Sequence, residues 1–185
     1  MIGGLATGSK LIIDQINIFR SIFGTMGNPF DSWLMLRSLE TLKIRMEAQA
    51  TSAIKVAKFL EKHGRIKSVT HPSLLEVGSE QHRIFKEQCK NVGSLICFDL
   101  MDDRQEMAFR FLNSLKICKL AVSLGSTETL IQHPKTMTHS DFLPERLSEL
   151  GIFNSTIRIS IGLENVDDII KDLKTGLEKL DEIRN

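Results

Sequence analysis

Residues 156–163, near the carboxyl end of the chain, show a strict alternation of apolar with polar or small side chains. The apolar members are Ile157, Ile159, Ile161 and Leu163, and the alternating members are Thr156, Arg158, Ser160 and Gly162. A period of two predicts a β-strand, because successive side chains of a strand point to opposite faces of the sheet. One face of this strand should be buried, and the other should carry the guanidinium of Arg158. The fold therefore has to contain a sheet that this strand can join.

A second apolar run, residues 117–124, predicts another strand, which stops at the segment Ser123-Leu124-Gly125. Gly125 permits a turn there, and the small residues leave backbone amides open to a ligand. A guanidinium fork beside free amides can hold a carboxylate. The alternative, from the residues alone, is an arginine that is solvated or in an ordinary ion pair. The candidate binding residues are Arg158, Ser123 and Leu124.

From residue 65 onward, strand and helix patterns alternate. Strands are expected at residues 66–70, 94–100, 117–124 and 157–163. Ser79 should cap one helix, the segment 103–106 is spaced like a capping box for the next, and Asn165 should cap the last. The pattern predicts an α/β layer domain of about 120 residues, with helices packed on a sheet of about four strands.

The amino end carries a different pattern. Residues 1–8 are apolar and glycine-rich and predict a buried strand, including Ile2 to Leu5, and Ser9 could cap a short helix that begins near Lys10. The segment 24–29 predicts a break rich in turns. Asp31 or Ser32 could then cap one long amphipathic helix with apolar positions from Leu34 to Leu60. Residues 62–64 would end this helix.

Composition excludes several classes of partner. The net charge is +1 and no basic run occurs, so nucleic acid is not indicated. No run approaches the roughly 18 apolar residues of a membrane-spanning helix, and no signal peptide opens the chain. Three cysteines without paired spacing (Cys89, Cys97 and Cys118) indicate reduced thiols in a cytoplasmic protein. The five histidines lack the spacing of metal ligands, and we expect no metal site.

Four segments in the carboxyl-terminal part carry a family resemblance. They are Ser123-Leu124-Gly125, residues 128–134 (Glu-Thr-Leu-Ile-Gln-His-Pro), residues 137–140 (Met-Thr-His-Ser) and residues 157–164. In order and spacing they resemble the carboxyl-terminal part of the Cys/Met-metabolism enzymes that use pyridoxal phosphate. That family includes methionine γ-lyase, cystathionine γ-lyase and γ-synthase, and homoserine-ester sulfhydrylases.

The resemblance implies a division of the chain and roles for its residues. Residues 1–27 would be a remnant of the large cofactor domain, 28–64 a linking helix, and 65–185 the small domain, whose sheet is mostly antiparallel in the family. Arg158 would grip the α-carboxylate of a sulfur amino-acid substrate, with Ser123 and the Leu124 amide against the same group. Gly125 would be structural, and His133 and His139 would fix their loop rather than do chemistry.

The resemblance also exposes a departure. The lysine that forms the Schiff base, and its Ser-x-Thr-Lys context, are absent from the sequence, and neither Lys10 nor Lys135 has a matching context. We therefore expect no catalytic and no cofactor-binding residue in this chain. Pyridoxal phosphate would serve the complete enzyme, and the isolated chain would be inactive.

Several alternatives for the function remain open. The chain could be the carboxyl-terminal half of an enzyme for trans-sulfuration, acting by γ-elimination or γ-replacement on methionine, cystathionine or homoserine esters. It could instead be a non-catalytic module that associates with a full-length relative, or a free-standing α/β binding domain. The residue at position 122, Val122, resembles the one in methionine γ-lyases. Arg20 and Ser21, in contrast, stand at positions where those lyases carry a Lys-Asp pair. Lyase, synthase and sulfhydrylase chemistry stay open, and the expected partner is a cofactor domain or further copies of the chain.

Overall fold

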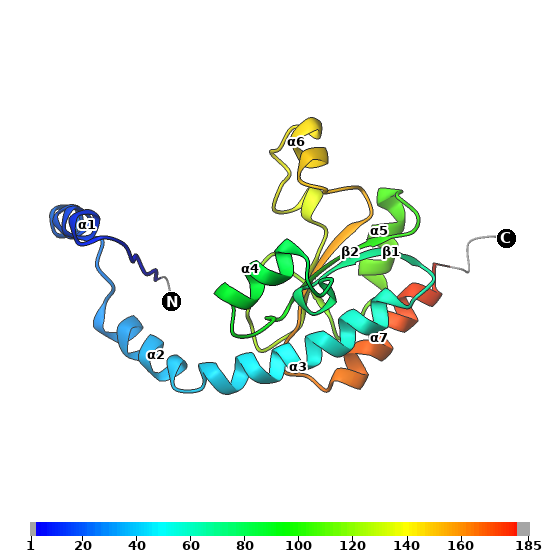
Figure 1. Cartoon of the computed structure of the whole chain (residues 1–185), viewed down its shortest axis with the longest axis horizontal. Helices are drawn as coiled ribbons and strands as arrows, with labels where there is room; N and C mark the ends of the chain where they lie inside the picture. Colours follow the sequence, from blue (N-terminus) through cyan, green and yellow to red (C-terminus); the bar gives the residue numbers. More distant parts are fainter. Residues whose placement is uncertain (1–2, 181–185) are drawn as a thin grey trace. The chain divides into compact units, whose positions relative to one another are not determined.

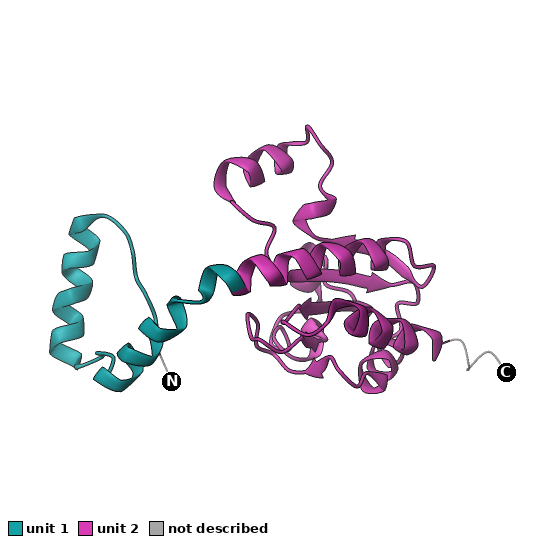
Figure 2. Ribbon diagram, turned by 90° about the horizontal axis from the view of Figure 1, so that it is seen from below, with its two compact units in different colours: residues 1–44 teal, residues 45–185 magenta. Residues whose placement is uncertain are grey.

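The computed structural model describes residues 3–180. The chain divides into two compact units, Met1–Ile44 and Arg45–Asn185 (Figure 2). Each unit is described by itself. The division expected from the sequence, with boundaries after residues 27 and 64, stays a prediction.

Unit 2 is an α/β domain built on a five-stranded sheet in the order β1-β2-β5-β4-β3 (Figure 1). The strands are β1 (Ile66–Thr70), β2 (Leu95–Leu100), β3 (Lys119–Leu120), β4 (Leu130–Gln132) and β5 (Thr156–Ser160). Three of the four pairings are antiparallel, and β3 pairs with β4 in parallel. The expectation of about four mostly antiparallel strands is thus replaced by a mixed sheet of five.

The strand expected over residues 117–124 shrinks to the two residues of β3. Asp172 of the last helix explains its late start. The carboxylate of Asp172 accepts hydrogen bonds from the backbone amides of Lys116, Ile117 and Cys118, at 2.9 to 3.2 Å. Amides held in this way cannot join a strand ladder, because each N–H makes one strong bond. β3 is the edge strand on this side of the sheet, and β4, which the apolar pattern did not separate from the loop after residue 124, lies between β3 and β5.

Unit 2 contains five helices among its described residues. Their bounds are α3 (Leu42–Glu61, whose first three residues belong to unit 1), α4 (Glu80–Gln88), α5 (Gln105–Ser114), α6 (Pro144–Glu149) and α7 (Val166–Glu178), with short 3₁₀ turns η1 (Pro72–Leu74) and η2 (Pro134–Thr136). The core joins α3, α5 and α7 to the apolar face of the strands; fully buried members include Leu60, Phe111, Leu173, Ile96, Ile131 and Ile159. Because Ile159 pairs with both Ile96 and Ile131, this face is continuous across three strands.

The helix caps show where the local sequence was sufficient to predict the structure and where it was not. The Ser79 hydroxyl accepts from the His82 amide, and the Asn165 side chain accepts from the Asp167 amide, which confirms both predicted caps. The prediction of a capping box at residues 103–106 is wrong, because α5 has Arg104 as its N-cap. The Asp103 carboxylate instead accepts from the backbone amide and hydroxyl of Ser155, on the segment that leads into β5.

The second face of β5 differs from the simple expectation. Thr156 and Ser160 are buried there, and only Arg158 is partly exposed. Both buried hydroxyls are bonded: Thr156 donates to Asp99 at 2.6 Å, and Ser160 accepts from the Gly125 amide at 3.0 Å. The polar face is therefore a covered, hydrogen-bonded surface from which one guanidinium emerges.

Unit 1 contains α1 (Lys10–Phe23) and α2 (Pro29–Leu39) among its described residues. The predicted break between them is confirmed, and Asn28, rather than Asp31 or Ser32, caps α2 by accepting from the Asp31 amide. The prediction of a single long helix is wrong, since α2 ends at Leu39 and α3 begins at Leu42. The Ser38 hydroxyl donates to the Leu34 carbonyl, a bond that bends helices and precedes the break.

The strand predicted at residues 1–8 is not present in its described part. Residues 3–9 form neither helix nor strand, and Leu5 is 93% exposed. Met1 and Ile2 lie outside the described residues. A strand needs a partner edge, and the five described strands pair with one another in the sheet of unit 2.

Candidate functional site

The candidate site is organised around Arg158 in β5. In the strand register Arg158 lies opposite Cys97 of β2 and Gln132 of β4, so the three side chains share one face of the sheet. Burial raises the pKa of the Cys97 thiol, and the positive charge of Arg158 opposes that rise. The thiol thus stays protonated and leaves the guanidinium without an anionic neighbour at this position.

Arg158 is fixed by the loop that follows β3. Its Nη2 donates to the backbone carbonyls of Val122, at 2.6 Å, and Ser123, at 3.2 Å. Within the described part of the chain, Nε and Nη1 have no hydrogen-bond acceptor. One nitrogen of the guanidinium therefore holds the loop, while the rest of the fork is available to a ligand.

Exposed backbone amides lie in the segment whose carbonyls hold Arg158. Val122, Ser123 and Leu124 are exposed, and in residues 3–180 their amides have no protein acceptor. Gly125 ends the segment with φ of +75°, a conformation that glycine adopts without a steric penalty, and its amide donates to the Ser160 hydroxyl. Because Arg158 is bonded to the carbonyls of the same segment, the structure brings the three predicted residues Arg158, Ser123 and Leu124 together.

A set of buried contacts, none predicted from the sequence, anchors the loop. Thr129 donates through its amide and its hydroxyl to the Glu164 carboxylate, at 2.6 and 2.7 Å. The Gly162 amide donates to the Thr129 hydroxyl, and the Leu163 amide donates to the Thr127 carbonyl. These bonds fasten residues 127–129 to the segment that leaves β5.

Gln49 of α3 supplies a further anchor. Its Nε2 donates to the Ser126 carbonyl at 2.7 Å, across 77 positions of sequence. The sequence did carry a signal for this residue, since Gln49 stands four positions before Ala53 on the apolar side of the helix pattern. A glutamine on such a stripe indicates a buried polar contact.

The two histidines of the loop are engaged within it. His133 is buried; its Nδ1 pairs with the Thr136 hydroxyl and its Nε2 with the Asn154 carbonyl, both at 2.8 Å. Burial lowers the pKa of His133, which keeps the ring neutral at neutral pH. His139 pairs with the Thr138 hydroxyl and packs edge-on against Phe142.

Neither Lys10 nor Lys135 has the setting of a lysine that forms a Schiff base. A Schiff-base lysine needs a desolvated pocket. Lys10 instead forms an exposed pair with Asp14 at 2.7 Å, with 88% of its side chain accessible. Lys135 donates to the Asn154 side chain at 2.7 Å, on the loop that His133 fixes. Nor does the described chain gather three or more His, Cys, Asp or Glu side chains in the way a metal ion requires.

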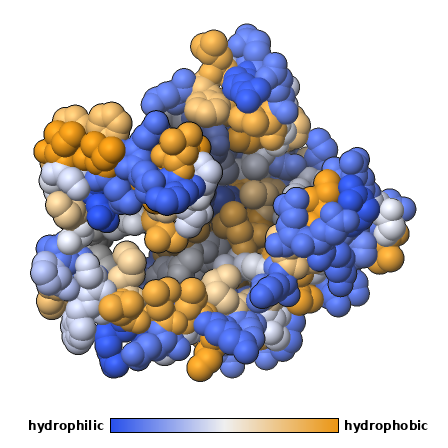
Figure 3. All heavy atoms as spheres, turned by 60° about the vertical axis from the view of Figure 1, so that its left-hand side comes forward, coloured by the Kyte–Doolittle hydropathy of each residue, from blue (hydrophilic) through white to orange (hydrophobic). Residues whose placement is uncertain are grey.

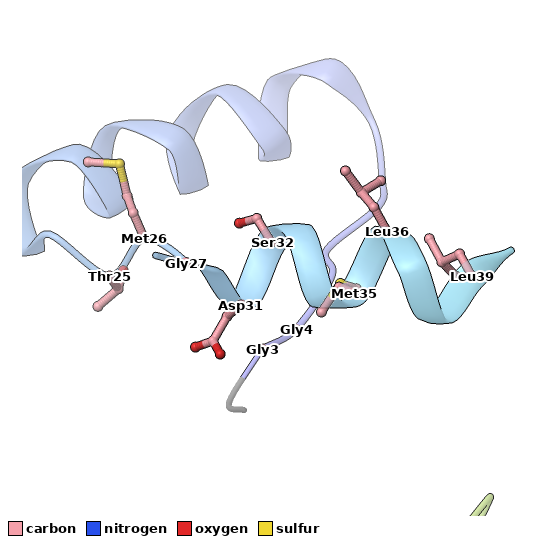
Figure 4. A pocket seen from close by; sticks show the side chains of 10 residues that line it. All are labelled: Gly3, Gly4, Thr25, Met26, Gly27, Asp31, Ser32, Met35, Leu36 and Leu39. Atoms are coloured by element: carbon pink, nitrogen blue, oxygen red, sulfur yellow. The ribbon is translucent and has the colours of Figure 1, made fainter. Parts of the chain in front are cut away.

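A hollow in unit 1 does not include the candidate site. It measures about 680 Å³ and is lined by Gly3, Gly4, Thr25, Met26, Gly27, Asp31, Ser32, Met35, Leu36 and Leu39 (Figure 4). Its side chains come mostly from α2 and are mainly apolar. None of residues 3–44 is buried, so this hollow is an open groove of a unit without a core rather than a formed ligand pocket.

Comparisons with known proteins agree with this fold. The Cys/Met metabolism PLP-dependent enzyme family matches residues 1–178. The L-methionine γ-lyase of Fusobacterium nucleatum subsp. polymorphum is 43% identical over 182 residues, covering 97% of this chain and 45% of the lyase. The chain thus spans about half the length of the curated relatives it matches.

Two solved structures extend the comparison. A cystathionine γ-lyase from Micromonospora echinospora has a TM-score of 0.84 at 28% identity, covering 92% of this chain and 44% of that one. A Campylobacter jejuni chain assigned as O-acetylhomoserine (thiol)-lyase has a TM-score of 0.74 at 41% identity, covering 81% of this chain and 35% of that one. In residues 3–180, no helix has the length and apolarity needed to cross a membrane.

Proposed function

Because this chain belongs to the Cys/Met metabolism PLP-dependent enzyme family, we propose that it supplies the site for the α-carboxylate of a sulfur amino acid. One observation carries the proposal. The Arg158 guanidinium is held by the Val122 and Ser123 carbonyls, and its Nε and Nη1 have no acceptor among the described residues. A planar cationic fork matches the shape and charge of a carboxylate.

The geometry suggests how the site would orient a substrate. A carboxylate that meets Arg158 with both oxygens is fixed in direction as well as in position. The Ser123 hydroxyl and the neighbouring amides would limit its rotation further. Orientation of this kind lowers the barrier of a later chemical step, because less freedom is lost on the way to the transition state.

We propose that the cofactor is held outside these 185 residues, by a cofactor domain. The family depends on PLP, but the described lysines lack the desolvated setting of a Schiff base and the sequence has no Ser-x-Thr-Lys segment. The partner would therefore be a cofactor domain, and the isolated chain would be inactive. The reaction class would be γ-elimination or γ-replacement, with Val122 favouring methionine and Arg20 and Ser21 leaving synthase or sulfhydrylase chemistry open.

Carboxylate recognition can be tested on the chain alone. Titration with L-methionine should shift the amide NMR signals of Ser123 and Leu124 and the side-chain Nε–H signal of Arg158. L-Methioninol, which has a hydroxymethyl group in place of the carboxylate, should bind at least about tenfold more weakly, because it offers no anion to the guanidinium. Equal binding of the two compounds, or shifts confined to other residues, would exclude this site.

A second candidate function, a non-catalytic module that binds a relative, is favoured by the surface of unit 1. None of residues 3–44 is buried, and the face in Figure 3 shows several apolar patches. Exposed large apolar side chains of this unit include Leu11, Ile18, Phe19, Ile22, Phe23, Phe30, Trp33 and Leu36. Exposed large apolar side chains in this number indicate an interaction surface.

We expect the isolated chain to self-associate or to bind a cofactor domain through unit 1. Light scattering should give a mass above that of one chain, and a dye that binds exposed apolar surface should fluoresce. Replacing Phe19 and Phe23, whose rings stack at 6.1 Å, with glutamate should reduce both signals without loss of the unit 2 fold. Exposed Lys10 replaced with glutamine is the control. A monodisperse monomer with no dye signal would contradict this expectation.

A further inference from the structure

Gln49 lies entirely inside unit 2, yet it is polar and belongs to an otherwise apolar helix face. Its exposed fraction is 0%, and its neighbours on the buried side of α3 include Ala50, Ala53 and Val56. Through Nε2 it reaches the Ser126 carbonyl at 2.7 Å. Ser126 follows directly the segment that carries the free amides of Ser123 and Leu124.

Stability alone does not explain a glutamine at this position. The other half of its amide, Oε1, is buried and has no hydrogen-bond partner in the described structure. A buried acceptor without a donor destabilises the folded state. The Ser126 carbonyl is on a partly exposed residue, where water could serve it. Methionine, which has nearly the same length and no polar atom to desolvate, would fill this place at lower cost.

The other attachments of the loop all come from β5 or the segment after it. Arg158 holds the carbonyls of Val122 and Ser123, and Ser160 holds the amide of Gly125. Residues 127–129 are bonded to residues 162–164. The bond from Gln49 comes from α3 and attaches the loop to a second element of the fold.

We propose that Gln49 is a positioning residue, which fixes the segment 122–126 that carries Ser123 and Leu124 and holds the Arg158 guanidinium. The role rests on the proposed carboxylate site and adds to it a residue 77 positions from the loop it orients. Its side chain meets the Ser126 carbonyl and not the ligand. Its loss would therefore act on carboxylate affinity through the order of the loop.

The test is Gln49→Met in the full 185-residue chain. L-Methionine should bind about tenfold more weakly, as expected for losing the geometry of one or two hydrogen bonds. Amide hydrogen exchange should accelerate in residues 121–129 and stay unchanged in β5. The melting temperature should remain within about 3 °C of wild type, because the substitution removes the unpaired Oε1 of Gln49 together with the hydrogen bond to Ser126.

Two companion variants sharpen the result. Gln49→His keeps a ring N–H of similar reach and should restore most of the affinity. Thr51→Val, on the same helix with a hydroxyl bonded to the Glu47 carbonyl, should change neither affinity nor loop exchange. If only the volume of the side chain at position 49 mattered, Gln49→His would not restore the affinity for methionine.

The outcomes separate this proposal from the function on which it rests. Methionine-selective binding by the wild type, with unchanged affinity or unchanged loop exchange in Gln49→Met, would overturn the Gln49 proposal alone. A fall in melting temperature beyond about 6 °C would assign Gln49 to core packing and overturn it as well. Failure of the wild type to distinguish methionine from methioninol would overturn the carboxylate site and the role of Gln49 together.

Discussion

Replacing Arg158 with alanine should lower kcat/KM for a sulfur amino acid about a hundredfold, because a charge-assisted bidentate pair contributes on the order of 3 kcal/mol. The assay requires the chain joined to a cofactor domain, such as the amino-terminal part of the Fusobacterium lyase that is 43% identical to it. The loss should appear mainly in KM, since the guanidinium would meet the α-carboxylate in the ground state and in the transition state alike. The absorbance of the bound cofactor should not change.

Two further variants make this result specific. Arg158→Lys should recover little, because an ammonium cannot reproduce the planar fork or hold the Val122 carbonyl in the same way. Arg146→Ala removes a surface arginine that pairs with Glu149 and should leave the kinetics unchanged. A kcat/KM for Arg158→Ala within about threefold of wild type would show that the arginine is an ordinary surface residue.

The sequence predicted the elements whose signals are local. The strand at residues 66–70 and the strand near 95–100 appear at those places, and the caps Ser79 and Asn165 form as expected. Period, capping chemistry and glycine turns act within a few residues, so they can be read without knowing the fold. The family followed from the same stretch, since residues 120–163 carry most of the resemblance.

Two of the errors in unit 2 share a physical cause, which is competition from partners far along the chain. Asp172 takes three amides more than fifty positions away and shortens β3. Asp103, spaced as a helix cap, is instead bonded to Ser155, 52 positions later. Gln49 lies on the apolar side of α3, and its hydrogen bond goes to Ser126, 77 positions later. A carboxylate or amide satisfies whichever donor or acceptor the folded chain brings to it, and local spacing does not reveal which one that is.

The structure draws attention to a glycine that the alternating pattern had treated only as a small residue on the polar face. A Cβ built on Gly162 would lie 2.5 Å from the Glu128 carbonyl carbon, the Thr127 oxygen and the Glu164 carboxylate. Two of these three atoms belong to the backbone, so a flexible side chain cannot simply swing away. Gly162 is therefore the place where the strand carrying Arg158 and the segment 127–129 come into direct contact.

Gly162→Ala should destabilise the chain by about 3 kcal/mol and lower its melting temperature by roughly 6 to 12 °C. The methyl group would push residues 127–129 away from β5 and break the bond between the Gly162 amide and the Thr129 hydroxyl. Because the carboxylate loop is anchored on this segment, methionine affinity should fall as well. Gly64→Ala is the matched control, since its Cβ would meet nothing within 4 Å, and it should leave stability and binding unchanged. If thermal unfolding of Gly162→Ala matched that of Gly64→Ala, the close contact at Gly162 would not be what fixes the loop to the strand.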